Sequence, residues 1–154
     1  MFKSLLKFGL VVVVSQVVTY YFAGILAQTV LGAGQFYPPS ADAIRYLRDP
    51  HDPGLQAWIL PAQALRGLLF AIVLFPFRKQ INELGVLRGG LAVAGFVFVA
   101  GYVAASGGMI EHFVYFKAED YPVKFAVITF IEILIQAVLM GPWTVAWMRR
   151  WRVV

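Results

Sequence analysis

The chain alternates between four long apolar stretches and shorter polar segments. The apolar stretches cover residues 8–33, 57–77, 89–110 and 123–148. A helix needs about 20 mostly apolar residues to cross the hydrocarbon core of a bilayer, and each stretch meets this length. The pattern predicts an all-α integral membrane protein, a bundle of four transmembrane helices that forms a single domain over residues 1–154.

The composition excludes the main alternatives to a membrane protein. Hydrophobic residues make up 60% of the chain and charged residues only 14%, which is too apolar for a typical soluble domain or a disordered segment. The net charge of +5 does not indicate nucleic-acid binding, because most of the basic residues stand at the ends of apolar stretches, where topology and anionic lipids explain them. The absence of cysteine excludes disulfides and thiolate chemistry.

Basic residues gather on one side of the predicted topology. That side carries Lys3, Lys7, Arg78, Lys79, Arg88, Arg149, Arg150 and Arg152, and the other carries Arg45, Arg48, Lys117 and Lys124. Cytoplasmic loops are enriched in Lys and Arg, so we expect both termini in the cytoplasm. This bias is compatible with a bacterial inner membrane.

The long outer loop over residues 34–56 has a pattern of its own. Ser40 can cap a short interfacial helix over 41–48, which the following prolines would end.

A faint repeat also links the second and fourth helices, because Arg66 precedes Pro76 by ten residues and Glu132 precedes Pro142 by ten. Two pseudo-repeated hairpins would produce this match, and so would chance among apolar helices.

Two charges inside apolar helices are the strongest chemical signal. A charge near the middle of a bilayer costs at least about 2.5 kcal/mol, and Arg66 and Glu132 both lie near the middle of predicted helices. We expect the two side chains to form an ion pair. The neighbouring polar residues should turn inward with them and complete a polar core: Gln16, Tyr20, Gln63 and Gln136.

This polar core has two interpretations. It can be a structural lock that sets the register of the helices. It can instead be a binding site, in which Arg66 holds an anionic group while Glu132 changes its protonation state.

The third helix carries a stripe of small residues, which allow another helix to approach closely. The stripe consists of Gly90, Ala94, Gly101, Ala105 and Gly108. The sequence does not say whether the partner helix belongs to the same chain or to a second copy.

Nothing in the sequence names an enzyme, and no cofactor is indicated. The outer side gathers metal-ligand types, of which His51, His112, Asp49 and Asp52 are the nearest candidates. Their spacing matches no helix-borne zinc site and the prolines among them are typical of a turn, so we expect no metal.

Three functions remain open from the sequence. The first is a small protein that binds or moves a solute, a lipid or an ion through the polar core. The second is a non-catalytic structural or assembly subunit of a larger membrane complex. The third is a membrane enzyme acting on a lipid or a quinone. The bilayer is the expected partner, together with a second copy of the chain or a larger complex.

Overall fold

The computed structural model describes residues 2–40, 43–44, 47, 49, 51–104 and 122–153. The elements in this part are α1 (Phe2–Thr29), η1 (Ala33–Phe36), α2 (Pro53–Leu74), η2 (Phe75–Phe77), α3 (Arg78–Glu83), α4 (Gly85–Phe98), η3 (Val99–Val103) and α6 (Val123–Arg150). Every described element is helical, and four helical stretches are long and apolar enough to cross a membrane. The prediction of an all-helical chain with four membrane-length helices is confirmed.

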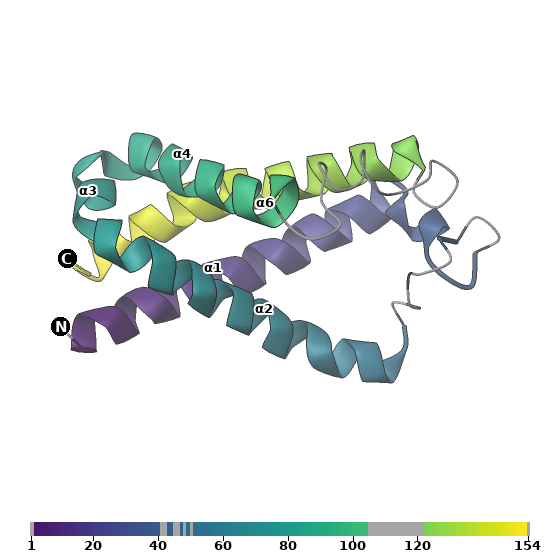
Figure 1. Ribbon diagram of the computed structural model, residues 1–154, viewed down its shortest axis with the longest axis horizontal. Helices are drawn as coiled ribbons and strands as arrows, with labels where there is room; N and C mark the ends of the chain where they lie inside the picture. The colour runs from purple at the N-terminus through teal and green to yellow at the C-terminus, as the bar shows by residue number, and fades with distance from the viewer. Residues whose placement is uncertain are drawn as a thin grey trace.

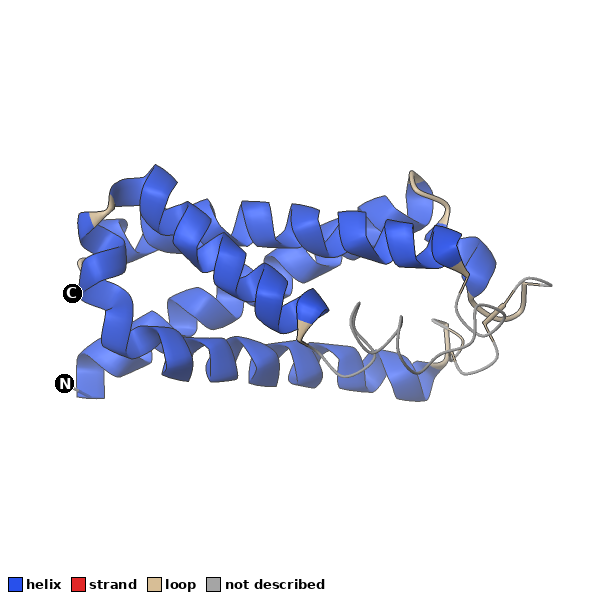
Figure 2. Cartoon of the chain, turned by 45° about the horizontal axis from the view of Figure 1, so that its top comes forward, coloured by secondary structure: helices blue, strands red, loops and turns tan. Residues whose placement is uncertain are grey.

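The long helices lie lengthwise beside one another (Figure 1). Helix α1 packs against both α2 and α6, and α4 packs against α6. Helix α2 diverges from the other helices away from the chain ends. Both ends of the described chain lie at one end of the molecule, which we call the termini end. The described residues of the connection between α1 and α2 lie at the opposite end, the loop end (Figures 1 and 2).

Several helix boundaries differ from the predicted ones, and two of the helix starts have local reasons. Helix α1 begins at Phe2 rather than at residue 8, because Lys3 and Lys7 favour helix although they are not apolar. Helix α2 begins at Pro53, a residue suited to the first turn of a helix. The carboxylate of Asp52 caps this turn by accepting the Gly54 N–H at 2.8 Å.

A tight reversal joins α2 to α4 at the termini end. Pro76 lies in the 3₁₀ turn η2, and Gly85 begins α4 with a positive φ of 80°, a conformation that costs a glycine little. Pro142 holds the matching position of the proposed repeat but lies inside the continuous helix α6. The two proposed repeat units therefore differ locally, and the pseudo-repeat stays a prediction.

The small residues of α4 face α6. A side chain at Gly141 would overlap the Gly90 carbonyl oxygen and come within 2.9 Å of the Ala94 nitrogen, and one at Gly90 would lie 2.8 Å from Pro142 Cα. Further along, a side chain at Gly101 would contact the Ile133 side chain at 3.8 Å. The stripe thus meets a helix of the same chain. Ala105 and Gly108 lie outside the described residues.

Buried apolar side chains form two clusters. The larger one fills the half of the molecule toward the termini end, where Phe8, Val12, Met140 and Met148 are completely buried. The smaller one, at the loop end, joins the connection to α1 and α6 through Ala27, Ala33, Phe36, Ile44, Phe125 and Ile128. Ile44, Ala43 and Leu47 are the described residues of the predicted interfacial helix 41–48, and none of them is helical.

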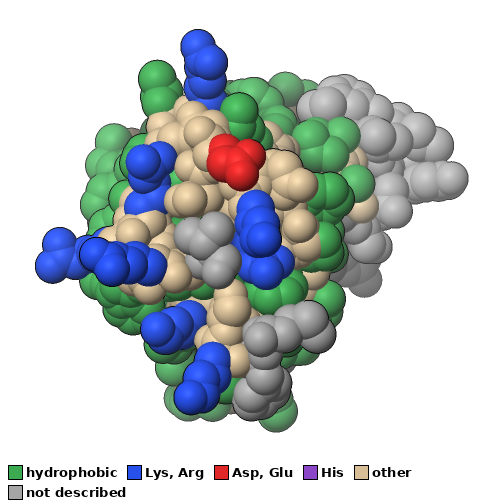
Figure 3. Space-filling view, turned by 90° about the vertical axis from the view of Figure 1, so that its left-hand side faces the viewer, with side chains coloured by type: hydrophobic (Ala, Val, Ile, Leu, Met, Phe, Trp, Pro, Cys, Tyr) green, Lys and Arg blue, Asp and Glu red, His purple; other side chains and the backbone are tan. Residues whose placement is uncertain are grey.

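The termini end carries a concentration of basic side chains. Figure 3 shows this face, on which Lys and Arg dominate over acidic groups. The start of α1, the reversal at α3 and the end of α6 supply them, with Glu83 as an acidic neighbour. The described basic residues that the sequence assigned to one side therefore share one end of the molecule.

Candidate functional site

A cavity of about 220 Å³ lies between α1, α2, α6 and the connection after α1. Its lining mixes apolar and polar side chains: Tyr20, Tyr21, Gly24, Ile25, Ala27, Gln28, Ala33, Tyr37, Gln56, Ile59 and Glu132. Pockets for drug-sized ligands run to roughly 300–1,000 Å³, so this one suits a smaller molecule.

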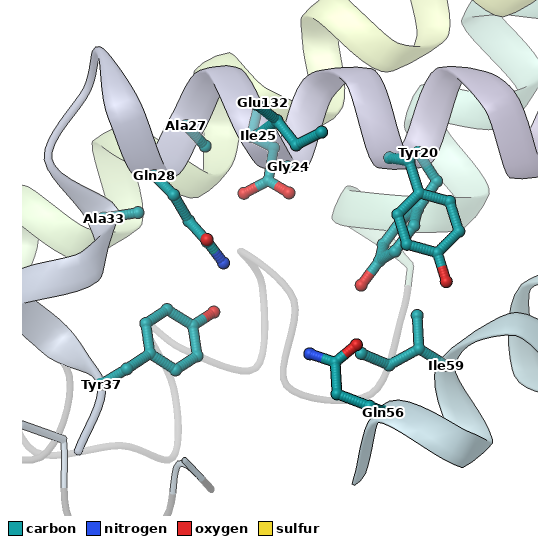
Figure 4. A pocket seen from close by; sticks show the side chains of 11 residues that line it. Tyr20, Gly24, Ile25, Ala27, Gln28, Ala33, Tyr37, Gln56, Ile59 and Glu132 are labelled. Carbon is teal, nitrogen blue, oxygen red and sulfur yellow. The ribbon is translucent and has the colours of Figure 1, made fainter. Parts of the chain in front are cut away.

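Among the described residues that line the cavity, Glu132 is the charged one. It is half-buried, and its carboxylate lies against the backbone of α1, where a Cβ at Gly24 would stand 3.7 Å from Oε1. Figure 4 shows the carboxylate directed into the same space as the amides of Gln28 and Gln56 and the hydroxyl of Tyr37. The cavity thus offers one carboxyl group surrounded by neutral hydrogen-bonding groups and tyrosine rings.

Arg66 does not lie in this cavity. It lines a separate, deeper space, and no ion pair joins Arg66 to Glu132 in the part of the chain that the structure describes. The predicted buried salt bridge is therefore not found. Helix α2 packs extensively on α1, and the Arg66 side chain stays exposed where it lines this second space together with Ile133 and Gln136 of α6.

The remaining polar residues connect the two spaces. The Tyr20 hydroxyl is within electrostatic range of both Glu132 and Arg66, and it interacts with the Gln63 side chain. Gln63 in turn accepts a hydrogen bond from Gln16, with 2.9 Å between Nε2 and Oε1. Both amides are buried. The structure therefore places a row of polar groups between the Glu132 cavity and the middle of the helices.

The deeper space has a volume of about 10 Å³, no more than a single water requires. Gln16, Arg66 and Gln136 line it together with Gly101. Gly101 lies in η3, a π-helical turn in which the Ala104 N–H bonds to Val99 C=O at 2.8 Å. Such turns recur at functional sites, and no sequence pattern indicated this one.

Sequence reasoning missed several residues of the cavity. Gln28 and Gly24 follow Tyr20 at intervals of four residues, so one face of α1 carries them all. Gln56 precedes Gln63 by two turns on α2. These helical spacings could have revealed Gln28 and Gln56 as members of the site. Tyr37 lies in the connection, where periodicity gives no signal.

The metal candidates have other roles where the structure describes them. Asp49 Oδ1 accepts the His51 N–H at 2.8 Å, and Asp52 caps α2. Among the described residues no group of three or more His, Cys, Asp or Glu side chains could hold a metal ion. His112 lies outside the described residues.

Comparison with protein-family models, with curated proteins and with solved structures finds no match for this chain.

Proposed function

We propose that this chain is a small polytopic membrane protein that binds a small cationic solute in the cavity around Glu132. The observation that carries the proposal is a carboxylate in a cavity wall with no ion-pair partner among the described residues. A half-buried carboxylate is poorly solvated, and a nearby cation replaces part of the electrostatic stabilisation that water would otherwise supply. The rings of Tyr20, Tyr21 and Tyr37 add faces that attract cations.

This proposal changes the expected role of the two charges. Arg66 was expected to hold an anionic group beside Glu132, but it does not line the Glu132 cavity. Among the described lining residues, Glu132 therefore sets the sign of the preferred ligand. The basic termini end supports a cytoplasmic position for that end, so the cavity would open on the outer side of the membrane.

The packing favours binding over an open pore. Toward the termini end, the polar groups give way to completely buried apolar side chains, including Phe8, Val12 and Met140. A solute that entered from the loop end would meet this apolar core. Movement across the membrane would require the helices to separate.

The test is binding of choline to the purified protein, measured by calorimetry against its neutral carbon isostere, dimethylbutanol. We expect Glu132→Gln to weaken choline binding about tenfold or more, because an interaction with a charged group is worth roughly 1.5–3 kcal/mol. Glu83→Gln makes the same change at the opposite end of the molecule and should leave binding unaltered. Equal binding of choline and the isostere would refute the proposal.

One observation favours the second function, a subunit of a larger membrane complex. Arg66 is exposed near the middle of α2, a helix that packs extensively only on α1 among the described elements. A charge at this depth is rare without a partner, and a carboxylate on another protein's helix would supply one. Native mass spectrometry of gently solubilised protein distinguishes the functions, because a stoichiometric foreign subunit supports the complex.

A further inference from the structure

A second feature lies on the surface between α1 and α6, away from the Glu132 cavity. It is an almost wholly apolar groove of about 120 Å³, lined by Leu10, Val11, Val14, Trp143, Trp147 and Trp151. The three tryptophans remain 37–42% exposed, so no other described part of the chain covers them. Trp147 and Trp151 stack edge to face, with ring centroids 5.1 Å apart.

Exposed cations follow the groove toward the termini end. Lys7 precedes Leu10 and Val11 by three and four residues, so it shares their face of α1. Arg150 follows Trp147 by three residues and shares the tryptophan face of α6. Arg149 is directed elsewhere, since its Nη1 donates to the Asn82 carbonyl at 3.2 Å.

We propose that this groove and its two cations form a binding site for an anionic phospholipid. One acyl chain would lie along the apolar lining, and the phosphate would lie between the Lys7 ammonium and the Arg150 guanidinium, which both bind phosphate well. Tryptophans favour the depth at which the chains and headgroups of a bilayer meet.

The size of the groove argues for a lipid chain over a protein helix. A helix with its side chains is roughly 10–12 Å across, and a groove of about 120 Å³ offers no seat for it. The positive charge at one end of the groove selects an anionic headgroup over a zwitterionic one. The site does not depend on the function proposed for the Glu132 cavity.

The experiment is native mass spectrometry of the full chain in micelles that hold equal amounts of phosphatidylglycerol and phosphatidylcholine. The wild type should retain phosphatidylglycerol preferentially. The pair Lys7→Gln and Arg150→Gln should reduce that preference about tenfold or more, because two cations next to the headgroup are lost.

The matched control removes the same charge from the same end. The pair Lys79→Gln and Arg88→Gln alters exposed residues of α3 and α4, and it should keep the preference. Equal losses in the two pairs would mean diffuse attraction and would overturn the site. Retention of both lipids in equal amounts by the wild type, or a second copy of the chain seated on the tryptophans, would overturn it as well.

Discussion

At the residue scale, Gln16 and Gln63 show that a buried amide in an apolar helix bundle requires a hydrogen-bond partner. Gln16 is completely buried, and its Nε2 donates to Gln63 Oε1 across the α1–α2 contact. Gln16 Oε1 is itself buried without a hydrogen-bond partner. The pair therefore joins two helices while leaving one acceptor unsatisfied, which limits its net contribution to stability.

We expect Gln63→Leu to destabilise the protein by about 1 kcal/mol, because the substitution leaves the whole Gln16 amide buried and unpaired. Replacing both glutamines by leucine should restore most of the lost stability, since neither amide of this pair is then left buried without its partner. Unfolding in mixed micelles measures both effects. Additive losses in the double variant would show that the two amides are not coupled.

At the element scale, the α4–α6 contact depends on glycine backbones rather than on large side chains. Gly141 and Gly90 bring the two helices so close that a Cβ on either would meet backbone atoms of the other helix. Close backbone approach increases the dispersion contacts between the two helices.

We expect Gly141→Ala to destabilise the protein by about 1–3 kcal/mol, because the added methyl group must push the helices apart. The control is Gly95→Ala, which also lies on α4 but away from the contact, since a Cβ there meets nothing within 4 Å. That variant should be neutral or slightly stabilising, as alanine favours helix. Unfolding in mixed micelles measures both changes, and a neutral Gly141→Ala would contradict the close contact.

At the scale of the whole molecule, charge asymmetry gives the chain its proposed orientation. Described basic residues concentrate at the termini end (Figure 3), whereas the Glu132 cavity lies toward the loop end. The proposed orientation therefore decides from which side of the membrane a solute reaches the cavity.

The absence of native cysteine makes this orientation directly testable. A single cysteine at Lys79 should react with a membrane-impermeant maleimide only after the membrane is opened, and one at His51 should react in intact cells. Both positions are exposed. The reverse pattern would invert the topology and place the cavity on the cytoplasmic side.

The class of the protein and its membrane-length helices followed from the sequence, because apolar length is a local property that each segment displays by itself. The helix-packing role of Gly90 and Ala94 was also expected from local spacing, but the sequence did not identify Gly141 and Pro142 as the contacting residues. A packing partner depends on how two distant segments meet, and no single segment encodes that.

At the candidate site, too, the sequence predicted which residues matter, and the tertiary structure decided which of them meet. The sequence identified Glu132 and Arg66 as costly charges, since burying a charge in an apolar stretch is evident from the residues alone. Only the tertiary structure separated them, because α2 packs mainly on α1 and diverges toward the loop end. Helix rotation and crossing set which faces meet, and these depend on the sum of many weak contacts along the whole chain.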